Sequence, residues 1–347
     1  MTQLTRECLE SLAFAALCAP SADNRHQFHI RCEGNRLFLV ATPELQAASL
    51  RRRILGQIST GAVVENLTLR GHAIGLRLEL HPGPPFGDDA SVLADFDFHE
   101  CPPAIDPLHL AIEARHSNRR ADYTGPALTA DEKDRVASEV ERVSDCRLTW
   151  LDAPSLRKHA ARALALAERE RFRNRELHRE LFEAIRFDVG WHATATEGLP
   201  PGVLELPWYE RLAFQRLRCW PAQRFANLFG ASRVAAYSSA GLPCREAPNV
   251  FVISTSANGI AGAFACGRAT QRAWLSLTAQ GFAVQVYAAA ALYSIPGVAE
   301  IPLRISQELT GIWSTLCPSH HPFMLFRVGR CTAASMRTSR PSPSTIL

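Results

Sequence analysis

Three arginines and a serine lie close together in the middle of the chain, in the run Arg115-His116-Ser117-Asn118-Arg119-Arg120. A guanidinium matches the oxygens of a phosphate or carboxylate, and charge-assisted hydrogen bonds of this kind are strong and directional. Alternate side chains of an extended segment project to the same side, so Arg115, Ser117 and Arg119 could converge on one anion. Taken alone, a run of this kind is more often a solvated basic segment of the surface than an anion site.

Two further groups of polar residues could take part in binding. The turn Pro20-Ser21-Ala22-Asp23-Asn24 offers a hydroxyl and an amide that can bind the edge of a heterocycle or a polyol chain. Its alternative interpretation is a helix stop with local Asx bonding. Arg337 and Arg340 in the C-terminal tail are either a loose basic end or a clamp that closes over an anion.

Other familiar chemistries have little support in the sequence. His26 and His29 lie near the Ser21/Asn24 turn and His320 and His321 precede Pro322, but no G-x-S-x-G elbow accompanies them. The chain also has no P-loop and no G-x-G-x-x-G. Its ten cysteines form no C-x-x-C pair and have no zinc spacing, so we expect no metal site. A hydrolase, an NTPase and a Rossmann dehydrogenase are therefore not favoured.

Length and composition describe a globular protein with a large core. The 347 residues are 47% hydrophobic and 21% charged, which suggests two domains or one double unit. The net charge is +4, and the basic residues are spread along the chain and mixed with acidic ones. This balance suits a small anionic ligand and does not indicate a nucleic-acid partner. The apolar run 12–19 follows Glu7 and Glu10, which is not typical of a signal peptide. We expect a cytoplasmic protein with no membrane partner.

Periodicity and turn residues predict a mixture of helices and strands. Helices are expected over residues 3–18, 51–75, 107–116, 156–187 and 261–281, with a further one starting at the capping box Thr129 to Glu132. Strands are expected over residues 27–32, 36–41, 76–80 and 249–254, and a Pro/Gly-rich loop over 81–89. Residues 190–245 suggest an irregular aromatic stretch, and the composition of the Ser/Thr/Pro-rich tail predicts disorder.

A repeated pattern of glycines occurs in the two halves of the chain. Gly61 and Gly75 bracket thirteen residues of an apolar helix, and Gly267 and Gly281 bracket another thirteen. A β-prone run follows each bracket. Matched helix length, stop signal and following strand favour a duplication, in which two helices of equal length pack as a pseudo-symmetric core.

Taken together, these features resemble the FMN-dependent nitroreductase family. In that family an Arg-x-Ser-x-Arg motif holds the FMN phosphate, and Arg115-His-Ser117-Asn-Arg119 is similar to it. A Pro-Ser-x-x-Asn turn contacts the flavin from the opposite subunit, which the resemblance assigns to Ser21 and Asn24. A basic C-terminal segment often completes the phosphate site, and Arg340, with Arg337, would fill that role.

The order of these motifs is similar to the double-length, Acg-type branch, in which two degenerate units are fused. The resemblance implies an α+β, nitroreductase-like fold that forms an intramolecular pseudo-dimer around long central helices. We expect an N-terminal half unit over residues 1–100 and a C-terminal unit over 101–347, with a lid-like insertion at about 190–245. Each unit supplies the half site that the other lacks, which predicts one flavin site in a monomer or a weak homodimer.

The implied function is electron transfer from NAD(P)H through FMN to a nitro compound, a quinone or a similar small acceptor. No catalytic acid or base is assigned, because hydride transfer through the flavin needs an oriented donor and acceptor more than a titrating side chain. The first alternative is a protein that stores or sequesters FMN under a lid. The second is a degenerate fold that acts only as an interaction module.

Overall fold

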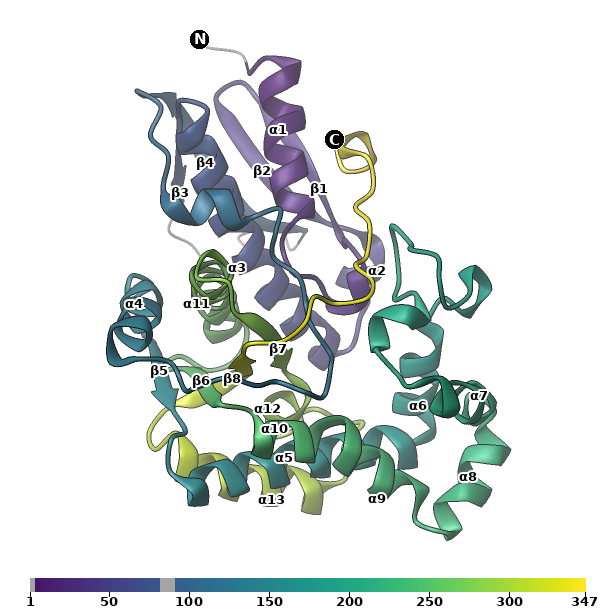
Figure 1. Ribbon diagram of the computed structural model, residues 1–347. Helices are drawn as coiled ribbons and strands as arrows, with labels where there is room; N and C mark the ends of the chain where they lie inside the picture. The colour runs from purple at the N-terminus through teal and green to yellow at the C-terminus, as the bar shows by residue number, and fades with distance from the viewer. Residues whose placement is uncertain (1–3, 82–90) are drawn as a thin grey trace.

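The computed structural model describes residues 4–81 and 91–347, and it contains two antiparallel sheets of four strands each (Figure 1). The first sheet has the order β1-β2-β4-β3 and consists of β1 (Phe28–Glu33), β2 (Arg36–Ala41), β3 (Leu76–Leu80) and β4 (Val92–Glu100). The second has the order β5-β6-β8-β7 and consists of β5 (Cys146–Trp150), β6 (Asn249–Thr255), β7 (Ala283–Tyr287) and β8 (His321–Gly329). The two sheets therefore have the same strand order, since β1 to β4 correspond to β5 to β8.

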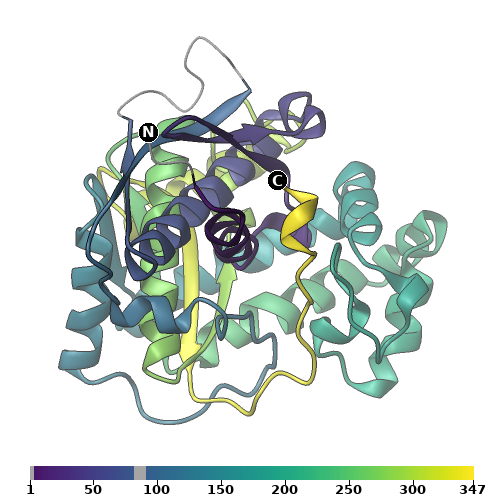
Figure 2. The ribbon, with the colours of Figure 1, turned by 90° about the horizontal axis from the view of Figure 1, so that it is seen from above.

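Each sheet is built around one long helix that connects its second and third strands. These helices, α3 (Leu50–Ala73) and α11 (Gly259–Ala279), cross in the middle of the molecule (Figures 1 and 2). Gly61 and Gly267 lie at the crossing, where the backbones touch. The glycine brackets seen in the sequence thus mark two equivalent helices, and the α+β fold with a pseudo-dimer inside one chain is confirmed.

A predicted helix precedes each sheet: the first begins at residue 6, three residues later than predicted, and the second begins at its predicted capping box. The hydroxyl of Thr5 accepts a hydrogen bond from the Cys8 backbone N–H at 3.2 Å and caps α1 (Arg6–Leu17). Thr129 and Glu132 form the predicted capping box of α4 (Ala130–Glu141), which satisfies two N–H groups at the helix start. Between β1 and β2, Gly34 adopts a φ of 61°, as a tight hairpin requires.

Two helix predictions in the second unit were wrong. The charged stretch 156–187 forms two helices, α5 (Pro154–Arg173) and α6 (Arg175–Glu183). Asn174 separates them, because its backbone is extended and its side chain accepts hydrogen bonds from the N–H groups of Glu176 and Leu177. Residues 107–116 form only a short 3-10 helix, η2 (Pro107–Ala111).

The stretch 190–245 is mostly helical rather than irregular. It contains the 3-10 turn η4 (Pro201–Leu204), the helices α7 (Trp208–Leu217), α8 (Trp220–Leu228), α9 (Ala231–Ala236) and α10 (Leu242–Glu246), and the π-turn η5 (Tyr237–Gly241). Together with α6, helices α7 and α8 project to one side of the molecule (Figure 2). The remaining helices are α2 (Pro43–Gln46), α12 (Ala289–Leu292) and α13 (Leu303–Leu316), with the turns η1 (Ala22–Asn24), η3 (Phe187–Val189) and η6 (Pro343–Thr345).

The C-terminal tail follows a defined path, against the disorder that its composition predicts. It leaves β8, crosses the second unit and ends beside α1 and β1 (Figures 1 and 2). The backbone N–H of Ile30 donates to the carbonyl of Ile346 at 2.6 Å, and the Ile346 side chain is buried in the first core. A buried anchor at its end offsets the entropy that would otherwise leave a polar tail unstructured.

Among residues 4–81 and 91–347, none of the helices meets the length and hydropathy that a membrane span requires. The same residues hold no cluster of three or more His, Cys, Asp or Glu that could bind a metal ion. The predicted loop over 81–89 lies outside the described residues, apart from His81.

Candidate functional site

One cavity of about 370 Å³ brings all six predicted binding residues together. Ser21 and Asn24 line it from the turn after α1, Arg115, Ser117 and Arg119 from the segment after η2, and Arg340 from the tail. Its other lining residues are Phe14, Cys18, Pro20, Ile112, Glu113, His116, Leu199, Val203, Trp274, Gln285, Val286, Met336, Arg337 and Thr338. Both units contribute, so the site lies between the two halves of the pseudo-dimer.

Arg115 occupies the buried end of this cavity. Its side chain is only 5% exposed, its Nη2 donates to the carbonyl of Cys18 at 2.8 Å, and its guanidinium stacks 4.5 Å from the ring centre of Trp274. Burial, and then the nearby charge of Arg340, lowers the pKa of Arg115 to about 9. The buried Nε of Arg115 and the buried Nε1 of Trp274 have no hydrogen-bond partner among the described residues.

The cavity has an excess of positive charge. Burial lowers the pKa of Arg119 and of Arg340 as well as that of Arg115. Glu113 is the single carboxylate among the lining residues, and it is exposed and paired with Arg70 at 3.0 Å. Buried cations that lack a counter-charge are costly, and an anion in the cavity would remove that cost.

Asn24 holds three distant segments together at the rim. Its side-chain amide donates to the carbonyls of Thr196 and Gly198 at 3.0 and 3.3 Å, and its Oδ1 accepts a hydrogen bond from Arg340 at 2.7 Å. Asn24 and its neighbour Asp23 both have positive φ, 54° and 58°, a conformation that Asn and Asp tolerate better than most residues. The Asn24 side chain is therefore fully engaged with protein groups.

The two serines differ from Asn24 in this respect. The hydroxyls of Ser21 and Ser117 line the cavity, and neither has a hydrogen-bond partner within the described part of the chain. Both are half-buried. They are free to bind a ligand that enters the cavity.

Sequence reasoning missed the apolar walls of the site. Trp274 comes from the middle of α11, Leu199 and Val203 from the insertion, and Met336 from the tail. Trp274 lies in an apolar helix where an aromatic residue reads as ordinary core, so no local signal marks it. The other three reach the site only through tertiary packing.

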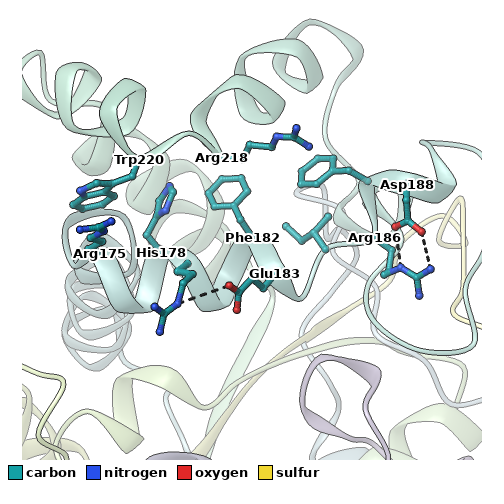
Figure 3. A pocket seen from close by; sticks show the side chains of 11 residues that line it. Arg175, His178, Phe182, Glu183, Arg186, Asp188, Arg218 and Trp220 are labelled. Atoms are coloured by element: carbon teal, nitrogen blue, oxygen red, sulfur yellow. Dashed lines mark hydrogen bonds and ion pairs between the residues drawn. The ribbon is translucent and has the colours of Figure 1, made fainter.

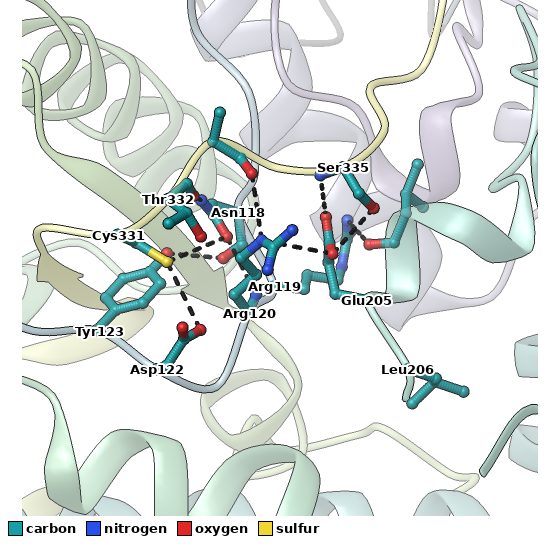
Figure 4. A network of polar contacts seen from close by, with 12 residues as sticks. Asn118, Arg119, Arg120, Asp122, Tyr123, Glu205, Leu206, Cys331, Thr332 and Ser335 are labelled. Carbon is teal, nitrogen blue, oxygen red and sulfur yellow. Dashed lines mark hydrogen bonds and ion pairs between the residues drawn. The ribbon is translucent and has the colours of Figure 1, made fainter. Parts of the chain in front are cut away.

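A polar network attaches the insertion and the tail to the arginine segment (Figure 4). Glu205 of the insertion accepts hydrogen bonds from the backbone N–H and the hydroxyl of Ser335 at 2.5 and 3.0 Å, and it lies 3.6 Å from Arg120 Nε. Asn118 donates to the carbonyl of Thr332 at 2.9 Å. The Glu205 side chain is almost fully buried, so this contact orders the chain that covers the cavity.

A second and larger cavity of about 590 Å³ lies along α6 (Figure 3). Its arginines are partly compensated, because Asp188 pairs with Arg186 at 2.7 Å and Glu183 lies 3.8 Å from Arg179. It contains none of the residues that the sequence analysis selected. The smaller cavity is therefore the candidate functional site.

Neither a family model nor a curated protein sequence matches the chain. Several solved structures are similar to it. An FMN-bound nitroreductase from Bacteroides fragilis has a TM-score of 0.41 and 12% identity, and one from Desulfitobacterium hafniense has a TM-score of 0.39 and 12% identity. A BluB-like flavoprotein from Clostridium difficile has a TM-score of 0.41 and 10% identity. Each match covers 70% of this chain and 98% of the other chain.

Proposed function

We propose that this chain is an FMN-binding oxidoreductase of nitroreductase type. One observation supports this most directly: one buried and two half-buried arginines converge on a cavity whose lining has a single, exposed carboxylate. A phosphate-bearing cofactor would supply the missing negative charge. The volume of about 370 Å³ falls within the range of small-molecule sites.

The residues of the cavity suit the two ends of such a cofactor. Arg115, Arg119, Arg340 and the free hydroxyl of Ser117 would hold the phosphate, and Ser21 would contact the flavin portion. We assign Asn24 a positioning role, because its amide already fixes Arg340 and the insertion. Bound flavin supplies the electron transfer, and the protein contributes orientation and charge. NAD(P)H as donor and a nitro compound or quinone as acceptor follow from the family resemblance.

A binding titration tests this proposal. FMN would be added to the purified apoprotein while flavin fluorescence is followed, for the natural chain and for Arg115→Ala with Arg340→Ala. Each lost charge-assisted hydrogen bond is worth roughly 1.5 to 3 kcal/mol, so the double variant should bind at least about 100-fold more weakly. A matched control replaces the exposed Arg147 and Arg304, which have no ion pair among the described residues. Equal affinity in the double variant and the control would refute the proposal.

FMN storage is the second candidate, and the covered cavity favours it. Leu199 and Val203 of the insertion and Met336 of the tail form part of the lining, and the Glu205 network holds both segments in place. Anaerobic addition of NADPH or NADH to the FMN-loaded protein separates the two functions. Reduction on the time scale of turnover supports the oxidoreductase, and bound flavin that neither donor reduces supports storage.

We further propose that the protein is a cytoplasmic monomer. All ten cysteines are free thiols, as in a reducing compartment. The helices that would pair two subunits, α3 and α11, already pack against each other within one chain. Light scattering at several protein concentrations tests the monomer.

A further inference from the structure

The projecting part of the insertion exposes an unusual number of apolar side chains. We define the arm as residues 206–237, which span α7, α8 and α9. None of the residues of α7 is buried, and Trp208 and Leu228 are about 80% exposed. Eight of the twelve large hydrophobic residues that are exposed in the described chain belong to the arm: Trp208, Tyr209, Leu212, Phe225, Leu228, Phe229, Val234 and Tyr237.

Some of these residues lie one helical turn apart. Trp208 and Leu212 are four residues apart on α7. Phe225 of α8 and Phe229, the residue that follows α8, are also four residues apart, with their ring centres 5.3 Å from each other. Residues at this spacing lie on the same helix face. Exposed apolar side chains that gather on neighbouring helices in this way mark an interaction site more often than an ordinary surface.

The arm is also strongly basic. It contains five arginines and one glutamate, a net charge of +4, which equals the net charge of the whole chain. Arg216, Arg224 and Arg233 are exposed and have no ion-pair partner among the described residues. The remainder of the chain is electrically balanced, so the arm is where an anionic surface would be attracted.

We propose that the arm is a peripheral docking surface for an anionic lipid bilayer. Short amphipathic helices with Trp, Phe and Leu on one side and arginine around them lie in the plane of a membrane interface. Basic residues gain about 1 kcal/mol each near an anionic leaflet. This proposal departs from the expectation of no membrane partner, which followed from the lack of a long hydrophobic run: the apolar residues of the arm are interrupted by charges.

The charge of the arm argues against one other occupant, and its aliphatic side chains argue against another. A second copy that docks arm to arm would bring two surfaces of like charge together, which costs free energy. Single-stranded nucleic acid could stack on the aromatic rings of the arm, but it would leave the exposed Leu212, Leu228 and Val234 without an apolar partner. An anionic bilayer offers an apolar layer to the aliphatic side chains and negative head groups to the arginines.

Vesicle flotation of the full chain tests the proposal. The natural protein should bind phosphatidylcholine vesicles that contain phosphatidylglycerol about tenfold better than vesicles of phosphatidylcholine alone, and added salt should weaken the binding. Replacing Phe225, Leu228 and Phe229 by serine should abolish it. Replacing Arg216, Arg224 and Arg233 by glutamine should remove the preference for the anionic lipid.

The control variant replaces two exposed apolar residues outside the arm, Leu110 and Leu303, by serine, and it should bind vesicles like the natural chain. Circular dichroism verifies that each variant is folded. Binding that is absent, or equal for both kinds of vesicle, would overturn the proposal. A concentration-dependent dimer that the Phe225, Leu228 and Phe229 variant abolishes, without vesicle binding, would identify a second copy as the occupant instead. None of these outcomes depends on FMN.

Discussion

Gly61 of α3 and Gly267 of α11 face each other where the two central helices cross: a Cβ on Gly61 would lie 3.0 Å from the Cα of Gly267. The same Cβ would collide with the carbonyl oxygen of Phe264, and a Cβ on Gly267 would collide with that of Ile58. Both glycines have ordinary helical backbones, so close approach rather than conformational freedom requires them. The crossing of the two units therefore depends on the absence of two side chains.

The first prediction concerns this crossing. Gly61→Ala or Gly267→Ala should lower the free energy of unfolding by about 3 kcal/mol, because backbone on the opposite helix has to move. Urea unfolding followed by circular dichroism measures it. Gly311→Ala is the matched control, since Gly311 lies in α13 with open space around its Cβ position and should gain up to about 1 kcal/mol from helix propensity. An unchanged unfolding midpoint in Gly61→Ala would contradict the close contact.

The paired units could be predicted because their signals are local. Glycine spacing, helix periodicity and the capping box at Thr129 all depend on neighbouring residues, and the structure confirms them. Strand β5 was missed because it is a short, half-buried edge strand with little alternation. The break between α5 and α6 was missed because the sequence does not show that the Asn174 side chain caps the start of α6.

The site could be predicted only in part, because only some of its residues belong to short local motifs. The arginine and turn motifs are short in sequence, and the structure brings all their selected residues to one cavity. The tail was expected to be disordered, because nothing in its composition reveals that Ile346 is buried beside β1. The partners of Asn24 lie 172 to 316 residues away, so its engagement by Arg340 and Thr196 follows from tertiary structure alone.

A second prediction concerns the buried charges between α3, α11 and α4. Glu65 is 1% exposed, and its carboxylate accepts hydrogen bonds from Arg268 at 2.6 Å and from Arg272 at 3.0 Å. Glu65→Gln should lower the free energy of unfolding by about 3 kcal/mol, because it breaks a buried ion pair: Arg268 loses its counter-charge and Arg272 keeps only Glu139. Urea unfolding of Glu10→Gln, which removes only an exposed pair with Arg6, should show no measurable change. Equal effects of the two substitutions would contradict the role of burial.

A third prediction tests Asn24 as the residue that holds the cover of the cavity. Asn24→Gly retains the positive φ but removes hydrogen bonds to Arg340, Thr196 and Gly198. Amide hydrogen exchange should accelerate in residues 194–200 and 336–342, because these segments lose their common partner. Ser319→Gly is the control, since Ser319 also has positive φ but is exposed and distant in sequence from both segments. Unchanged exchange in Asn24→Gly would show that the Glu205 network alone is sufficient.

The last prediction concerns His26, which lies beside the cavity with both ring nitrogens buried and without partners among the described residues. Burial, and then the charges of Arg340 and Arg115, lowers the pKa of His26 from 6.5 to about 4. Between these two values the unfolded chain binds a proton that the folded chain does not bind. The folded state is therefore progressively destabilised as the pH falls from 6.5 towards 4, and above 6.5 this contribution is constant.

From pH 7 to pH 5 this histidine alone should lower the free energy of unfolding by about 2 kcal/mol. His26→Phe should remove that component, so the difference between the natural chain and the variant should change with pH over this interval. Denaturant titrations at a series of pH values measure the difference, and other titrating groups cancel from it. The control is His159→Gln: His159 is half-buried in α5 and does not line the cavity, so this variant shows the effect of removing a histidine elsewhere in the chain. A pH-independent difference for His26→Phe would mean that His26 is accessible to water in the folded protein.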